Sequence, residues 1–175
     1  MKAPQVRWQN WDRRLSLRWV QAARRQPLTR LLCALLARSG DGLICLIVGA
    51  LVYALAPGAR GMLRQALAAL ALAAVLAAAL KFSVRRPRPP GPEAEQRRLF
   101  EADVYSFPSG HAARAAAIVC GLGGAWMPWR AALGLWAVGV AWARVAKGAH
   151  YLSDVTVGLA LGALAGGATA WLWPN

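Results

Sequence analysis

Long apolar blocks alternate with polar breaks along most of the chain. The five blocks cover residues 42–57, 66–84, 112–127, 131–145 and 155–173. Several approach the ~20 residues that an α-helix needs to cross the hydrocarbon core of a bilayer. The breaks between them are Pro57-Gly58, a long polar loop at 85–107, Pro128 and Lys147-Gly148. The pattern predicts an all-α, polytopic membrane bundle of about five transmembrane helices.

Residues 1–40 follow a different pattern. Between Trp11 and Arg38, leucine, valine and tryptophan recur among many arginines, with an interruption at Pro27. A membrane-crossing helix here would carry several arginines into hydrocarbon, at a cost of about 2.5–3.5 kcal/mol each. We therefore expect an amphipathic segment of one or two helices that lies at the membrane interface. The membrane domain would then cover residues 41–175.

The composition agrees with a membrane protein. Hydrophobic residues make up 58% of the chain, against about 45–50% in soluble proteins. The net charge of +14 could indicate a nucleic-acid-binding protein, but the lysines and arginines flank the apolar blocks and no nucleic-acid motif accompanies them. The expected partner is therefore the bilayer with its anionic lipids, and not nucleic acid. Residues 1–10 lack the apolar core of a cleavable signal peptide.

We expect neither a metal nor a cofactor. The cysteines, Cys33, Cys45 and Cys120, lie in apolar or amphipathic segments without the spacing of metal ligands. Acidic residues of the long loop are scattered and include Glu93, Glu95, Glu101 and Asp103. Any chemistry would therefore rely on cationic side chains and backbone N–H groups.

Ionisable side chains gather in three clusters at the ends of the apolar blocks. The clusters are Lys81 with Arg85, Arg86 and Arg88; Phe107-Pro108-Ser109-Gly110-His111; and Arg144 with His150 and Asp154. They fall at the end of the second block, the start of the third, and the junction of the fourth with the fifth. Because successive spans alternate in direction, all three clusters should lie on one membrane face. Ionisable groups are costly in a membrane, so this convergence indicates a functional site.

Together the clusters favour a phosphate-binding site. The cationic side chains available are Lys81, Arg88 and Arg144. The planar guanidinium group of arginine matches the spacing of phosphate oxygens. Pro108 suits the first turn of a helix, which would leave the N–H groups of Ser109 and Gly110 to bind an anion. Ser109 could equally serve as a helix cap.

Both histidines of the chain, His111 and His150, fall in these clusters. Asp154 lies one helical turn after His150, so its carboxylate could accept a hydrogen bond from one ring nitrogen and leave the other as a nucleophile. His111, beside the anion site, could then protonate the leaving oxygen. A single histidine near a helix end is usually structural, but the conjunction of groups favours catalysis. Arg114 either extends the site towards a second phosphate or acidic headgroup, or pairs with an acid of the loop.

The order and spacing of these residues resemble a known family. The segments Lys81-x6-Arg88-Pro89, Pro108-Ser109-Gly110-His111 and Arg144-x5-His150-x3-Asp154 look like the three-part signature of the type-2 phosphatidic acid phosphatases (PAP2). That family also includes bacterial phosphatidylglycerophosphate and undecaprenyl-pyrophosphate phosphatases, glucose-6-phosphatase and vanadium haloperoxidases. One feature departs from the signature, because Ala143 stands where the family usually has serine. Arg86-Pro87 also supplies an Arg-Pro pair, two residues too early for the family spacing.

The resemblance implies a role for each residue of the motifs. His150 would attack phosphorus to give a phosphohistidine, Asp154 would orient and charge it, and His111 would be the general acid. The phosphate would be bound by Lys81, Arg88, Ser109, Gly110 and Arg144, with Arg114 as a further candidate. The implied fold is that of the six-span members without their first span.

We therefore predict an integral membrane, metal-independent lipid phosphatase. Its substrate would be an isoprenyl phosphate or pyrophosphate, phosphatidate or phosphatidylglycerophosphate, and the sequence does not choose among them. The alternatives are a non-catalytic membrane protein that binds lipid phosphates, a relative of the soluble haloperoxidases, and a transporter.

The charge distribution also predicts an orientation. The N-terminal segment and the loops of the three clusters carry most of the arginines, whereas the opposite face offers little beyond Arg60, Arg64 and Arg130. By the positive-inside rule the active site would face the cytoplasm, in what we expect to be a bacterial inner membrane. An aromatic belt on the outer side would consist of Trp126, Trp129, Trp171 and Trp173.

Overall fold

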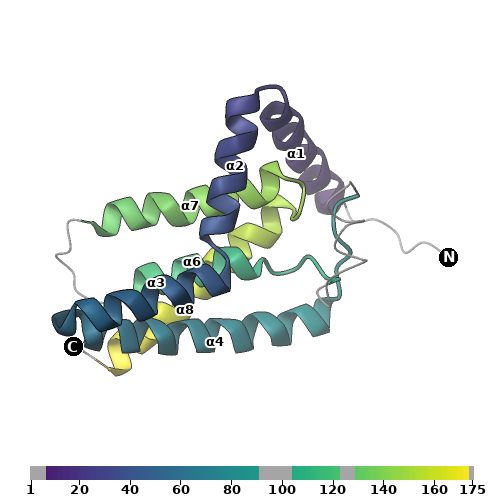
Figure 1. The fold of residues 1–175 in the computed structure, drawn as a ribbon. Coiled ribbons are helices and arrows are strands. Elements are labelled where there is room, and N and C mark those ends of the chain that lie inside the picture. The colour runs from purple at the N-terminus through teal and green to yellow at the C-terminus, as the bar shows by residue number, and fades with distance from the viewer. Residues whose placement is uncertain (1–6, 91–103, 123–128, 174–175) are drawn as a thin grey trace.

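A computed structural model of the chain describes residues 7–90, 104–122 and 129–173 (Figure 1). The helices are α1 (Arg7–Arg24), α2 (Pro27–Ser39), α3 (Gly42–Leu55), the short 3-10 helix η1 (Pro57–Ala59), α4 (Arg60–Val84), α6 (Gly110–Gly121), α7 (Arg130–Ala146) and α8 (Leu152–Leu172). Within the described ranges the only β contact is one isolated bridge, between Pro87 and Tyr105. The prediction of an all-α protein is confirmed. The scattered loop acids Glu93, Glu95, Glu101 and Asp103, and Trp126 of the predicted belt, lie outside the described residues.

The apolar blocks and the helices correspond one to one, in α3, α4, α6, α7 and α8. Two of these helices, α4 together with η1 (Pro57–Val84) and α8 (Leu152–Leu172), are long and apolar enough to cross a membrane. The pair α2 and α3 meets the same criterion only if it counts as one span that is bent by 62°. The protein is thus a helical membrane protein with two or three candidate spans among the described residues.

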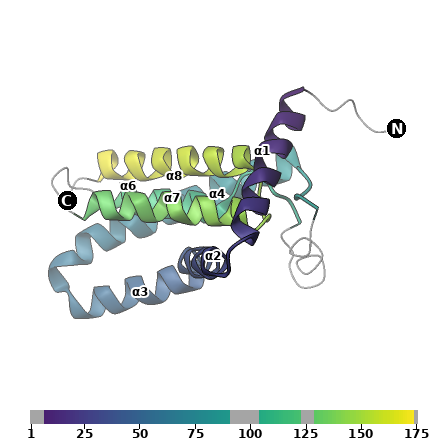
Figure 2. The same cartoon turned by 90° about the horizontal axis from the view of Figure 1, so that it is seen from above.

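Four helices form the centre of the bundle. Helix α6 packs against α4, α7 and α8, and Figures 1 and 2 show these four running side by side. Small side chains let the backbones approach closely: a Cβ at Gly158 would lie 2.6 Å from the carbonyl oxygen of Ser109, and one at Gly166 would lie 2.6 Å from Cβ of Cys120. Close packing through small residues is the usual mode of association between membrane helices. The glycines of α8 thus serve the packing of α8 against α6.

The long helix α4 ends where its sequence cannot continue. Arg85 adopts a left-handed φ of 49°, and its N–H donates to the carbonyl of Lys81 at 3.0 Å. Pro87 and Pro89 follow, and neither has the N–H that another helical turn would need. Arg86 and Arg88 therefore lie on an irregular segment that passes the beginning of α8.

Helix α1 lies across the end of the bundle where α4 and α7 terminate (Figures 1 and 2). One of its faces is buried against α7 and α8, and it consists of Asp12, Ser16, Val20 and Ala23. Tryptophans beside that face are largely exposed, with Trp8 at 53% and Trp11 at 61%. The buried face of α1 therefore contains both an acid and a hydroxyl group.

Candidate active site

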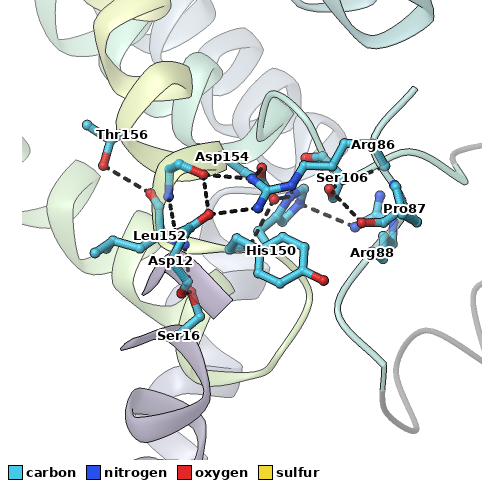
Figure 3. A network of polar contacts seen from close by, with 12 residues as sticks. Asp12, Ser16, Arg86, Pro87, Arg88, Ser106, His150, Leu152, Asp154 and Thr156 are labelled. Carbon is cyan, nitrogen blue, oxygen red and sulfur yellow. Dashed lines mark hydrogen bonds and ion pairs between the residues drawn. The ribbon is translucent and has the colours of Figure 1, made fainter. Parts of the chain in front are cut away.

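The two ring nitrogens of His150 have different partners. The residue follows the turn after α7 and is only 2% exposed. Its Nδ1 lies 2.7 Å from the carbonyl oxygen of Ser106. A carbonyl oxygen only accepts hydrogen bonds, so Nδ1 carries the hydrogen and Nε2 of the neutral ring keeps a lone pair. Nε2 lies 3.3 Å from Nη1 of Arg88 (Figure 3).

The surroundings keep this imidazole neutral. The pKa of His150 is lowered from 6.5 to about 4, mainly by burial and also by the positive charges of Arg144 and Arg88, while Asp154 acts in the opposite direction. At neutral pH the ring is therefore unprotonated at Nε2. A neutral imidazole with a fixed tautomer is the form that can act as a nucleophile.

The carboxylate of Asp154 does not make the direct hydrogen bond that its spacing predicted. Its Oδ2 lies 3.8 Å from Nδ1 of His150, within ion-pair range but longer than a hydrogen bond. Oδ2 instead accepts from the N–H of Tyr151 at 2.8 Å, and Oδ1 accepts from Nη1 of Arg86 at 2.7 Å. The hydrogen of Nδ1 therefore goes to the Ser106 carbonyl at 2.7 Å and not to Asp154. Asp154 is fully buried and so places a negative charge beside the ring.

The start of α6 differs from the prediction in one respect. Ser109 is the N-cap and the helix begins at Gly110, so Pro108 lies before the helix rather than in its first turn. The N–H of Ser109 donates to the backbone carbonyl of Asp154 at 3.0 Å and is not available for an anion. The Oγ atom of Ser109 is buried and makes no hydrogen bond within the described part of the chain. The N–H of Gly110 belongs to the first turn, which has no intrahelical acceptor.

His111 is paired with an acid that the sequence did not single out. Its Nε2 lies 2.8 Å from Oδ1 of Asp41, and the side chains are 13% and 50% exposed. Asp41 is the N-cap of α3, at the bend between α2 and α3. The bend is held in place from α7, because Nε1 of Trp136 donates to Oγ of Ser39 at 2.9 Å.

The remaining predicted residues divide between two places. Arg88 donates to the carbonyl of Ala149 at 3.0 Å and borders His150, while Arg144 is 3% exposed and acts on the pKa of the same ring. The other cations, Lys81 and Arg114, line a cavity of about 280 Å³ together with Gly110 and the alanines Ala73, Ala74, Ala77, Ala78 and Ala113. The structure thus surrounds His150 with one set of residues and places Lys81, Gly110 and Arg114 around an adjoining cavity.

Several contributors to the site were missed by sequence reasoning. Ser106 acts through its backbone, for which a sequence carries no signal. Arg86 was noted only as a member of the first cluster and as part of an Arg-Pro pair outside the signature spacing, without a role. Asp12 carried a signal that was not used: it shares a helix face with Ser16, Val20 and Ala23, and a lone acid on such a face usually has a buried partner. Groups of three potential metal-ligating residues are absent from the described ranges.

Residues 62–175 match the PAP2 superfamily. The chain therefore belongs to that superfamily, as its motifs predicted, and it is a membrane lipid phosphatase. Two crystal structures share its fold. LpxE from Aquifex aeolicus is 24% identical, with a TM-score of 0.73, and the match covers 90% of this chain and 93% of that one. The first transmembrane PAP2-type phosphatidylglycerolphosphate phosphatase from Bacillus subtilis is 23% identical, with a TM-score of 0.75, covering 96% of this chain and 87% of that one.

Proposed function

We propose that the protein removes phosphate from a lipid through a phosphohistidine formed at Nε2 of His150. The observation that carries this proposal is the neutral, buried ring of His150. Its Nδ1–H is fixed on the Ser106 carbonyl at 2.7 Å, and its Nε2 faces the guanidinium of Arg88 at 3.3 Å. The bound phosphate would replace Nε2 as the partner of Arg88 and so present phosphorus to the nucleophile.

Two transfers make up the proposed reaction. In the first, Nε2 of His150 attacks phosphorus, the bond from phosphorus to the lipid oxygen breaks, and His111 gives that oxygen a proton. In the second, water attacks phosphorus, the Nε2–P bond breaks and His111 takes up the proton of the water. The negative charge of buried Asp154 stabilises the imidazolium that exists between the two steps.

The phosphate-binding groups would be Arg88, Arg144 and Lys81 with Ser109 and the N–H of Gly110. The Oγ atom of Ser109 supports this assignment, because a buried hydroxyl without a partner is costly unless a ligand completes it. We assign Asp41 the task of orienting His111, since its Oδ1 lies 2.8 Å from Nε2.

The cavity beside the site suits the part of the lipid next to its phosphate. One wall is formed by four alanines of α4, while Lys81 and Arg114 supply positive charge. An acyl or isoprenyl chain would lie along the apolar wall, and a second anionic group would lie near Arg114. Isoprenyl phosphates and pyrophosphates, phosphatidate and phosphatidylglycerophosphate remain the substrates to test. The fold shared with the Bacillus subtilis phosphatase makes the last of them the first choice.

We further propose that α3, α4, α6, α7 and α8 are five spans, and that residues 1–40 form an interfacial segment attached to a catalytic domain at 41–175. The exposed tryptophans of α1 favour an interfacial position. The active site would face the cytoplasm of a bacterial inner membrane, because α1 and its arginines lie at the same end of the bundle as His150.

A phosphate-release assay tests the proposal directly. We expect purified protein to release phosphate from at least one member of a panel of lipid phosphates and pyrophosphates. EDTA should leave this activity unchanged, since cationic side chains and not a metal ion would neutralise the charge of the phosphate. Vanadate should inhibit the activity. Strict dependence on added Mg²⁺ for a metal-free substrate would contradict the mechanism, and release by a His150→Ala variant at the wild-type rate would contradict the site.

A further inference from the structure

An ion-pair network joins the N-terminal helix to the catalytic carboxylate (Figure 3). Arg86 donates from Nη1 to Oδ1 of Asp154 at 2.7 Å and from Nη2 to Oδ2 of Asp12, also at 2.7 Å. The two acids lie at opposite ends of the chain, on α8 and on α1. Their side chains are 0% and 4% exposed, and that of Arg86 is 14% exposed. One partly buried guanidinium thus bridges two buried carboxylates.

Further contacts fix the geometry of this network. Asp12 accepts through Oδ1 from the N–H of Ser153 at 3.1 Å and through Oδ2 from the hydroxyl of the same serine. Nη1 of Arg86 also donates to that hydroxyl at 2.7 Å. The guanidinium lies 4.0 Å from the centroid of the Tyr151 ring, where a cation is attracted to the ring face. Arg86 and both carboxylates therefore have little freedom to move.

The charge of Asp12 decides the net charge of the network that it forms with Arg86 and Asp154. Arg86 alone would neutralise Asp154, and the pair would then offer little to a positive charge on the neighbouring ring. With Asp12 included, two carboxylates share one guanidinium and the cluster is net negative. When phosphorus bonds to Nε2 while Nδ1 keeps its hydrogen, the ring of His150 becomes an imidazolium, and a net negative neighbour stabilises it.

We propose that Asp12 is a positioning residue for phosphoryl transfer: through Arg86 it fixes the carboxylate of Asp154, and it keeps the cluster of Asp12, Arg86 and Asp154 beside the phosphohistidine net negative. The N-terminal helix is thereby part of the catalytic apparatus and not only an attachment to the membrane. This inference rests on the proposed phosphohistidine mechanism, and it assigns a role to residues outside the three signature motifs.

The chain offers a matched control on the same face of α1. Ser16, one turn after Asp12, accepts the N–H of Leu152 at 2.9 Å and so also caps α8, but it has no charge and no contact with Arg86 among the described hydrogen bonds. If α1 only caps α8, Ser16→Ala and Asp12→Asn should have similar effects. If Asp12 acts through charge, only Asp12→Asn should slow the reaction.

The test uses the full-length protein in detergent or nanodiscs with the best substrate of the wild type. We expect Asp12→Asn to lower kcat by about tenfold to hundredfold, which is the effect of losing one charged hydrogen bond in the transition state. KM should stay near the wild-type value, and Ser16→Ala should change neither constant. An unchanged kcat in Asp12→Asn, or equal losses in the two variants, would overturn the proposal.

A second measurement does not depend on turnover. Vanadate bonded to Nε2 makes the ring imidazolium-like, whereas inorganic phosphate bound in the same site does not. Asp12→Asn should therefore weaken the binding of vanadate in calorimetry and leave the binding of phosphate unchanged. Equal changes for the two anions would overturn the proposal. A wild-type protein that released no phosphate from any lipid would refute the proposed function, and the two affinities would still decide the role of Asp12.

A double-mutant comparison with Arg86→Gln tests the proposal even if Asp12→Asn folds poorly. In an Arg86→Gln background the charge that Asp12 balances is gone, so adding Asp12→Asn should cost little more than Arg86→Gln alone. Strong non-additivity of this kind is typical of residues in one network. A loss from Asp12→Asn that is the same with and without Arg86 would show that Asp12 acts independently of it.

Discussion

The reactivity of His150 depends on which group holds each of its nitrogens. The backbone carbonyl of Ser106 takes the hydrogen of Nδ1, so a main-chain group selects the tautomer. Asp154 contributes charge from 3.8 Å away, while its oxygens cap α8 and bind Arg86. Orientation and charge stabilisation are thus supplied by different residues. Loss of the carboxylate should therefore affect the charge of the intermediate more than the direction of the nucleophile.

The first prediction at this scale concerns the intermediate itself. Replacing His150 by alanine removes the nucleophile, so an acid-labile, base-stable phosphoenzyme should disappear and turnover should fall to background. Quenched reactions with a ³²P-labelled lipid phosphate measure both. The matched control is His111→Ala, which should still form the phosphoenzyme but turn over slowly, most of all with poor leaving groups. Persistence of the label in the His150 variant would exclude His150 as the nucleophile.

A second prediction concerns the partner of the general acid. In Asp41→Asn, His111 loses the carboxylate that lies 2.8 Å from its Nε2. We expect up to about a tenfold loss in kcat for lipid monophosphates, whose alkoxide leaving group needs a proton, and little loss for pyrophosphates. The comparison to make is kcat across leaving groups of different pKa.

Ser39 supplies the control for this experiment. It lies in the same bend and binds Trp136, so Ser39→Ala disturbs the bend without removing the carboxylate. An equal loss for all leaving groups in Asp41→Asn, matched by Ser39→Ala, would mean that Asp41 only supports the bend.

The residues that sequence reasoning found and missed differ in kind. His111, His150 and Arg88 are visible because a few ionisable groups stand out at the ends of apolar segments and their spacing is regular. Ser106 could not be found, since its contribution is a carbonyl that any residue would provide. Asp41 and Asp12 belong to segments remote in sequence, and only the packing of α3 and α1 brings them to the histidines.

At the scale of elements, the contact between α6 and α8 places the catalytic groups. The N–H of Ser109 at the start of α6 donates to the carbonyl of Asp154 in the first turn of α8. Close approach at Gly158 keeps the two helix starts together, because a Cβ there would lie 2.6 Å from the carbonyl oxygen of Ser109. The packing of one glycine is thus coupled to the geometry of the anion site.

A pair of alanine substitutions tests this coupling. Gly158→Ala should lower the stability by about 1–3 kcal/mol through overpacking and reduce activity, because it separates Ser109 from Asp154. Gly167→Ala in the same helix is the control, since a Cβ there meets nothing within 4 Å. Thermal unfolding in detergent and phosphate release are the measurements. Equal effects of the two changes would show that the contact between α6 and α8 does not control the site.

The elements were largely predictable because the apolar blocks are long and bounded by proline, glycine or charge. All five became helices, and the interruption at Pro27 separates α1 from α2. Pro108 was misplaced because proline is favoured both before a helix and in its first turn, and only the path of the chain into α6 decides between the two. The face of α1 that packs on α8 was not predicted, since nothing in the pattern of residues 1–40 singled out Asp12.

At the scale of the whole molecule, the active site and the N-terminal helix share one end of the bundle. Asp12 of α1 contacts Arg86, which lies just past the last residue of α4. The first residue of α4, Arg60, lies at the opposite end of that helix, after Pro57 and Gly58. Arginines accordingly concentrate at the catalytic end, while Arg60 and Arg64 lie near the opposite one. Some of this positive charge serves phosphate binding in the proposed mechanism. The exposed arginines of α1 add positive charge at the same end that does not depend on that role.

The last prediction is the orientation of this molecule in the membrane. By the positive-inside rule the end that carries α1 and His150 should face the cytoplasm. Two single cysteines, placed in a background without Cys33, Cys45 and Cys120, report on the two ends of α4. Gly58→Cys lies where a side chain meets open space, and Val104→Cys is exposed beside Tyr105, which pairs with Pro87 past the end of α4. In intact cells a membrane-impermeant maleimide should label Gly58→Cys, and it should reach Val104→Cys only after permeabilisation. The reverse pattern would place the active site outside, and labelling of both positions without permeabilisation would contradict a membrane span at α4.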